Sequence, residues 1–125
     1  MSATLAAARK ILLVEDEYLI RVLLEDMLSD LGYAVAGAAG SVAEATELAK
    51  CAEFDLAILD VNLNGEEVYP VADILAGRGL PFIFVTGYGG RGLPAAYRSR
   101  PTLQKPFQME DLEKMLAASF TTGRP

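Results

Sequence analysis

Histidine is absent from this 125-residue sequence, and cysteine occurs once, at Cys51. The lack of histidine excludes histidine acid–base catalysis, zinc sites with histidine ligands and a phosphohistidine carrier. A single cysteine excludes an internal disulfide and is typical of a protein in the reducing cytoplasm. Because Cys51 falls late in a helical pattern, we expect its thiol to be buried and inert rather than reactive.

Long apolar runs and an excess of basic charge are also missing. No apolar run approaches the ~18–20 residues that span a bilayer, so we expect no membrane contact. The net charge of −6 disfavours direct binding of nucleic acid, which needs clustered Lys and Arg. The one basic cluster, Arg91 with Arg98 and Arg100, fits a solvated loop. With 52% hydrophobic residues, the chain has enough apolar surface for one domain with its own core.

Two hydrophobic periodicities alternate along the chain. Continuous apolar runs such as Ile11–Val14 are typical of strands buried on both faces. Helical patterns with apolar residues three and four apart follow them. This alternation predicts a doubly wound α/β fold with a five-stranded parallel sheet. The predicted strands are 11–14, 33–39, 54–59, 81–85 and 101–104, and the predicted helices are 20–31, 42–52, 66–77 and 109–120.

Local signals mark several helices. Ser41 fits an N-cap with Glu44 as its capping-box partner. Pro70 falls near the first turn of the predicted helix 66–77, where proline is best tolerated. The side chains expected to face the core include Leu23, Leu24 and Leu28, then Val68, Val71, Ala72 and Leu75, and finally Met109, Leu112, Met115 and Leu116.

The stretch from Thr86 to Arg100 interrupts the alternation. A crossover helix is expected there, but four glycines disfavour it by ~1 kcal/mol each, and a proline lies among them. We therefore predict that the fourth helix is disordered within a mobile loop, or shortened to one turn at 95–98.

Charged and hydroxyl side chains follow the strands at their carboxyl ends, where sites form in open α/β sheets. Asp16 and Asp60 would bind a hard divalent ion such as Mg²⁺ directly, and Glu15 directly or through water. The Asp60 carboxylate would attack a phosphoryl group. Thr86 and Lys105 would share the charge on the transferred oxygens. Taken singly, each residue has a simpler interpretation as a helix-dipole acid, a strand-end cap or a solvated lysine, but their order at successive strand ends favours one site.

Four strings of residues resemble those of response-regulator receiver domains of two-component signalling. They are Leu13–Glu17, Leu59–Gly65, Thr86-Gly87 and Lys105–Phe107, and the resemblance covers residues 9–120. It implies a flavodoxin-like sheet order of 2-1-3-4-5. It also implies a protein that catalyses only its own phosphorylation and dephosphorylation.

The resemblance assigns roles to the residues at the strand ends. Asp60 would be the phosphoacceptor, and Glu15 with Asp16 the acidic pair that binds Mg²⁺, or Mn²⁺ in its place. The main-chain carbonyl of Asn62 would be a further metal ligand. Thr86 would be the switch residue and Lys105 the phosphate contact, with a cis peptide between Lys105 and Pro106.

A narrower match covers Pro81–Tyr88, which resembles the PFxFATGY signature of a receiver subfamily, with Val85 in place of alanine. The match implies a sensor histidine kinase of the HWE/HisKA2 type as partner. One departure is Thr102, where receivers ordinarily carry a Tyr or Phe ring that rotates during the switch. We therefore expect the loop 87–100, beginning at Gly87, to become ordered instead.

The remaining expectations concern the whole chain. Residues 1–8 would be a flexible leader without the basic region of a signal peptide, 9–120 the receiver domain and 121–125 a short tail. A stand-alone regulator of this kind would act on a downstream protein or a phosphotransfer protein. Alternatives are a phosphate sink for a kinase, a degenerate receiver that binds proteins without phosphorylation, and an aspartyl-phosphate phosphatase. The last usually needs a second aspartate where this chain has Asn62.

Tyr88 follows the switch threonine by two residues, near the expected path of water to an acyl phosphate. We predict that it shields the phosphoryl group, so that Tyr88→Ala shortens the life of phosphorylated Asp60. An exposed loop tyrosine without this role would leave the dephosphorylation rate, followed by intact mass, the same in both proteins.

Overall fold

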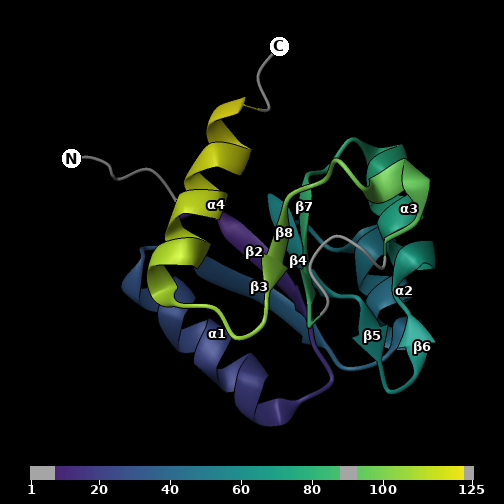
Figure 1. Cartoon of the computed structure of the whole chain (residues 1–125), viewed down its shortest axis with the longest axis horizontal. Coiled ribbons are helices and arrows are strands. Elements are labelled where there is room, and N and C mark those ends of the chain that lie inside the picture. The colour runs from purple at the N-terminus through teal and green to yellow at the C-terminus, as the bar shows by residue number, and fades with distance from the viewer. Residues whose placement is uncertain (1–7, 88–92, 123–125) are drawn as a thin grey trace.

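The computed structural model describes residues 8–87 and 93–122 and contains one main sheet with helices on both faces (Figure 1). The elements, in chain order, are β2 (Lys10–Val14), α1 (Tyr18–Asp30), β3 (Ala34–Ala39), α2 (Val42–Cys51), β4 (Leu56–Asp60), β5 (Asn62–Leu63), β6 (Glu66–Glu67), α3 (Tyr69–Arg78), β7 (Phe82–Thr86), the 3-10 helix η2 (Ala95–Tyr97), β8 (Thr102–Gln104) and α4 (Met109–Thr122).

The main sheet has five parallel strands in the order β3-β2-β4-β7-β8. This is the predicted doubly wound order, because the chain runs outward from β2 to one edge and then to the other. In Figure 1, α1 and α4 cover one face of the sheet, and α2 and α3 cover the other. None of the described helices has the length and apolarity to cross a membrane.

Strand alternation divides the apolar side chains between two cores. All five residues of β4 and all five of β7 are buried, as expected for central strands covered on both faces. Leu56 and Ile58 of β4 pack in the core that contains residues of α1 and α4. Ala57 and Leu59 point the other way, into the core that contains residues of α2 and α3. The two cores together fix the sheet from both sides.

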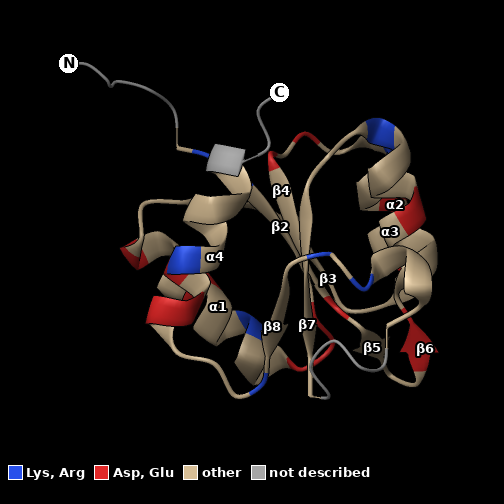
Figure 2. Cartoon of the chain, turned by 45° about the horizontal axis from the view of Figure 1, so that its top comes forward, with Lys and Arg blue, Asp and Glu red and all other residues tan. Residues whose placement is uncertain are grey.

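A short hairpin replaces the predicted start of the third helix. Strands β5 and β6 pair antiparallel across Asn64 and Gly65, both of which have positive φ, 52° and 88°. That combination is typical of the tight hairpin turn for which Asn-Gly is a strong signal. The helix therefore begins at Tyr69, with Pro70 in its first turn, and the predicted start at residue 66 is wrong. In Figure 2, β6 is red because both its residues are glutamates.

Most local predictions are confirmed, but three side chains differ. The Ser41 N-cap is present, since the Glu44 N–H donates to Ser41 Oγ at 3.1 Å, but the Glu44 carboxylate accepts from the Gly40 N–H at 3.0 Å rather than from that of Ser41. Cys51, however, is exposed, and the expectation of a buried thiol is wrong. Each helical residue turns the chain by about 100°, so Cys51 lies on the opposite side of α2 from the buried Ala49. Leu23 and Met109 are also exposed, at 45% and 40%.

The segment before β8 forms one 3-10 turn, which confirms a shortened fourth helix. Residues 88–92 lie outside the described residues, so the predicted mobility of the loop is not tested there. Tyr97 is buried at the end of this turn and donates a hydrogen bond to Asp73. Its ring packs edge-on against Phe82 and Phe84, with centroids 5.8 and 5.5 Å away. Arg100 lies 4.4 Å from the centroid of Phe82 and is therefore not simply a solvated loop residue.

Candidate functional site

The parallel register brings the predicted residues to one edge of the sheet. Val14 pairs with Leu59, so the acids after β2 lie next to the end of β4. Asp60 pairs with Val85, so Thr86 follows one residue beyond it on the neighbouring strand. The Lys105 N–H donates to the Thr86 carbonyl at 2.8 Å, which fixes the start of the lysine at the same edge.

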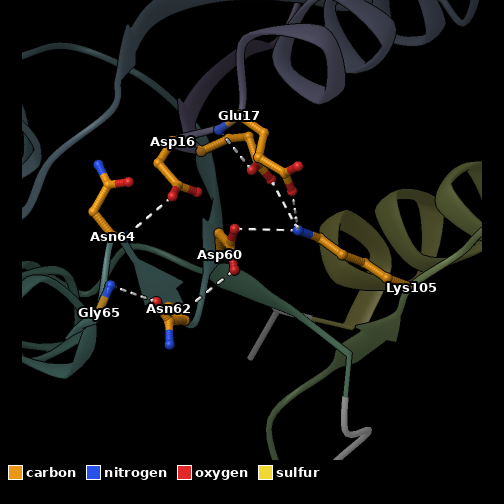
Figure 3. A network of polar contacts seen from close by, with 8 residues as sticks. Asp16, Glu17, Asp60, Asn62, Asn64, Gly65 and Lys105 are labelled. Atoms are coloured by element: carbon orange, nitrogen blue, oxygen red, sulfur yellow. Dashed lines mark hydrogen bonds and ion pairs between the residues drawn. The ribbon is translucent and has the colours of Figure 1, made fainter.

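The Lys105 ammonium lies among three carboxylates (Figure 3). Lys105 Nζ is 3.2 Å from Asp60 Oδ2, 3.4 Å from Glu15 Oε1 and 3.7 Å from Glu17 Oε1. The Glu15 and Asp60 side chains are only 2% and 8% exposed, whereas that of Glu17 is 65% exposed. Water screens the contact with Glu17, so Lys105 is held chiefly by Glu15 and Asp60.

Backbone N–H groups orient the acids. The Asn62 N–H donates to Asp60 Oδ1 at 3.2 Å, and the Glu17 N–H donates to Glu15 Oε2 at 3.1 Å. Across the site, the Asn64 N–H donates to Asp16 Oδ2 at 3.0 Å. Each of these acids therefore has at least one oxygen directed by a fixed donor, and the hairpin β5–β6 supplies the donor to Asp16.

Three of the acids fit a divalent cation. Glu15, Asp16 and Asp60 each offer one carboxylate oxygen, and these oxygens lie within 4.8 Å of one another. Oxygen ligands about 2.1 Å from an octahedral Mg²⁺ would be roughly 3–4 Å apart, so small side-chain movements suffice to bind it. Asp16 is half-buried beside two buried acids, which leaves one side of the cluster open to the water ligands that Mg²⁺ retains.

Burial governs the ionisation of the site. Burial raises the pKa of Glu15 to about 7, the negative charge of Asp60 adds to this, and a backbone hydrogen bond and Lys105 oppose it. Burial also raises the pKa of Asp60, although Lys105 lowers it in part. Burial alone would lower the pKa of Lys105, but the charges of Asp60 and Glu15 outweigh it and raise that pKa. A bound cation would favour the ionised carboxylates.

A cavity of about 260 Å³ opens beside Asp60. Thr86, which is only 5% exposed, lines it together with Gly87 from the same strand end. Its other walls are Val61, Asn62, Glu67, Tyr69 and Leu93. The cavity gives a group bonded to Asp60 room to lie beside Thr86.

The structure places the remaining predicted residues as follows. The peptide between Lys105 and Pro106 is cis, as expected. Thr102 does not line the cavity, and its hydroxyl donates to the Arg100 carbonyl at 3.1 Å. Tyr88 lies outside the described residues. The role of the Asn62 carbonyl as a metal ligand stays a prediction.

Sequence reasoning missed three residues of this region. Glu17 is a third acid near Lys105, and it follows the acidic pair directly in the sequence. Asn64 orients Asp16, and the Asn-Gly hairpin signal could have placed it. Tyr69 lines the cavity, but its position depends on where α3 begins, and the predicted start at residue 66 was wrong.

The family comparison agrees with this geometry. The model of the response regulator receiver domain matches residues 11–117, and the chain belongs to this family. The transcriptional regulatory protein PdtaR of Mycobacterium tuberculosis is 36% identical over 114 residues, which cover 88% of this chain and 56% of PdtaR. The chain thus spans about half the length of the curated relatives that it matches.

Two solved structures are similar over nearly their whole length. The solution structure of the BeF3-activated conformation of SdrG from Pseudomonas melonis Fr1 is 46% identical, with a TM-score of 0.77, and the match covers 90% of this chain and 97% of SdrG. The crystal structure of the receiver domain of the sensor histidine kinase PA1611 from Pseudomonas aeruginosa PAO1 has a magnesium ion coordinated in its active site cleft. It is 26% identical, with a TM-score of 0.81, and the match covers 93% of this chain and 100% of that domain.

The raised pKa of Glu15 predicts a stability that depends on pH and on metal. Because Glu15 binds its proton more tightly in the folded protein, the free energy of unfolding should fall as the pH rises from about 4.5 to about 7, by at most ~3.5 kcal/mol at about 1.4 kcal/mol per pKa unit. Mg²⁺ should reduce this loss by neutralising the ionised cluster.

The measurement is urea unfolding between pH 5 and 8, with EDTA or with Mg²⁺. Glu15→Gln is the control, because its side chain does not titrate. The same pH slope for wild type and Glu15→Gln in EDTA would contradict the prediction.

Proposed function

We propose that this receiver domain accepts a phosphoryl group on Asp60 from a sensor histidine kinase, with Mg²⁺ as cofactor. One observation carries the proposal: Asp60 lies 3.2 Å from the Lys105 ammonium, within an acidic metal cluster, and lines the cavity that Thr86 also lines. A buried carboxylate with a cation on one side and open space on the other suits an acceptor better than a structural ion pair.

The residues have separate tasks in this reaction. An oxygen of Asp60 forms a bond to phosphorus while the bond between phosphorus and the kinase's imidazole nitrogen breaks. The nitrogen keeps the electron pair of that bond. Lys105 and the Thr86 hydroxyl bind the oxygens of the transferred group, whose charge they stabilise. When bound by Glu15, Asp16, Asp60 and the Asn62 carbonyl, Mg²⁺ supplies further positive charge to those oxygens.

The relatives support both parts of the proposal. The PA1611 receiver coordinates magnesium in its active site cleft, and SdrG has a conformation activated by BeF3. The geometry of Lys105 and the acidic cluster in this chain supplies the groups that such chemistry needs. The PFxFATGY-like string favours a kinase of the HWE/HisKA2 type.

Helix α1 is the surface proposed for the kinase. Tyr18, Leu19 and Leu23 are 66%, 78% and 45% exposed, although all three are large and apolar. A cavity of about 350 Å³ lies beside Leu23 and is lined also by Lys105 and Phe107. An apolar surface next to the phosphoacceptor edge suits a kinase domain that must bring its histidine to Asp60.

The output is proposed to be a change in the loop 87–100 and the surface beside it. Thr86 would move toward the phosphoryl group, and the loop would become ordered as it follows. The proposed target is another protein, downstream or in a phosphorelay, within the cytoplasm. In this proposal residues 9–120 form the receiver domain that carries both the phosphoryl chemistry and this output. A phosphate sink would use the same Asp60 chemistry without this output.

Ordering of the loop predicts slower amide hydrogen exchange over residues 87–100 when beryllofluoride and Mg²⁺ are added. The reason is that Thr86 and its neighbours would gain a fixed partner at Asp60. The exchange of α2, which is distant from the loop in sequence, serves as the internal control. Equal exchange in the loop with and without beryllofluoride would exclude an order–disorder switch.

The acceptor role predicts a covalent adduct. Incubation with acetyl phosphate and Mg²⁺ should add ~80 Da to the wild-type chain, and none to Asp60→Ala, because the nucleophile is missing. Asp55→Ala is a matched control, since Asp55 is an exposed acid near the other end of β4. If the wild type gains no mass, the chain is better explained as a degenerate receiver that binds proteins without phosphorylation.

A further inference from the structure

The cavity beside Asp60 is larger than the group it would receive. Its volume of about 260 Å³ compares with about 30 Å³ for one water molecule in the liquid. A phosphoryl group therefore leaves room for water next to the phosphorus. The lifetime of the acyl phosphate must depend on which side chains exclude that water.

Tyr69 is the only aromatic side chain among the described residues that line this cavity. It lies at the first position of α3, and its ring contacts Phe84 of β7, the strand that also carries Thr86. Thr102, where other receivers carry a ring, does not line the cavity. Among the described residues, the aromatic surface of this cavity therefore comes from α3 rather than from β8.

Other rings hold Tyr69 in place. It meets Phe84 edge-on, with centroids 6.0 Å apart and an angle of 73° between the ring planes. It stacks on Tyr97 at 6.1 Å and 18°. Tyr97 is itself fixed by its hydrogen bond to Asp73 and by its edge contacts with Phe82 and Phe84. Because edge-on and stacked aromatic pairs of this kind are favourable beyond the area that they bury, the Tyr69 ring is held on two sides and forms a wall of the cavity.

We infer that the ring of Tyr69 shields the phosphoryl group on Asp60 from water. In the hydrolysis that it slows, a water oxygen bonds to phosphorus and the bond from phosphorus to the Asp60 oxygen breaks. The Asp60 carboxylate leaves with that electron pair, and inorganic phosphate and a proton pass to solvent. Tyr69 is a positioning residue in this step, since it takes no part in the bonds. The inference rests on the proposed function of Asp60.

The test is the decay of the phosphorylated protein. The wild type and the variants are loaded with acetyl phosphate and Mg²⁺, the donor is removed, and the ~80 Da adduct is followed by intact mass. Tyr69→Ala and Tyr69→Leu should shorten the half-life about threefold to tenfold, which corresponds to ~0.7–1.4 kcal/mol of activation free energy. Tyr69→Phe should stay within about twofold of wild type, because the ring remains.

Tyr33→Ala is the matched control. Tyr33 is also a half-buried tyrosine in a stacked pair, 5.9 Å from Phe120, but it precedes β3 at the opposite end of the sheet. Loss of its ring should lower the thermal midpoint and leave the half-life unchanged. If the alanine variant does not fold, Tyr69→Leu decides the test, because it also removes the ring while it keeps an apolar side chain at this position.

The outcomes separate this inference from the proposed function. A wild type that gains no adduct contradicts the acceptor role of Asp60. Adducts that form on every protein and decay at one rate contradict only the shielding by Tyr69. A half-life in Tyr69→Phe as short as in Tyr69→Ala would assign the effect to the hydroxyl and overturn the role of the ring.

Discussion

The ion pair between Lys105 and the buried acids is the contact on which the site depends. Three carboxylates at one edge repel one another, and burial removes the water that would screen them. Lys105 offsets this with a single charge that reaches Asp60 at 3.2 Å and Glu15 at 3.4 Å. Its backbone is tied to Thr86, so the cation is fixed to the same strand that carries the proposed switch residue. A divalent cation would have to share Asp60 and Glu15 with this lysine. Metal binding and the proposed phosphoryl transfer would then depend on the same charges.

A second constraint is the short segment before β8. A full helix would cover the sheet beside α3, but the described residues 93–101 form only the 3-10 turn η2. Aromatic side chains pack against this part of the sheet instead, and the Tyr97 ring contacts both Phe82 and Phe84. Phe82 and Phe84, the two phenylalanines of the PFxF string, therefore have a structural role. They pack against the Tyr97 ring, which holds the segment before β8 against the sheet. The same cluster contains Tyr69, which joins the packing of this segment to the wall of the cavity beside Asp60.

The sequence was sufficient for the fold and for the residues at the strand ends, because both follow from short-range patterns. Parallel strands bring their carboxyl ends together, so Glu15, Asp60 and Lys105 could be placed side by side before any contact was known. Residues whose positions depend on exact helix phase were harder. Cys51 lies about 200° around α2 from Ala49, and apolar content alone does not reveal that rotation. Tyr69 was missed because the hairpin β5–β6 shifts the start of α3, and only tertiary packing brings its ring to the cavity.

The absence of a ring at Thr102 changes how a signal can leave this site. The Thr102 hydroxyl donates a hydrogen bond to the Arg100 carbonyl, which anchors its side chain to the segment that precedes β8. The rings on the other face of the sheet, by contrast, touch both the cavity and the segment that ends at Tyr97. A displacement of Thr86 toward Asp60 would change the cavity that Tyr69 and Leu93 also line. In the proposed switch, the physical route from Asp60 would therefore run through α3 and the aromatic cluster, and it would not require a ring on β8.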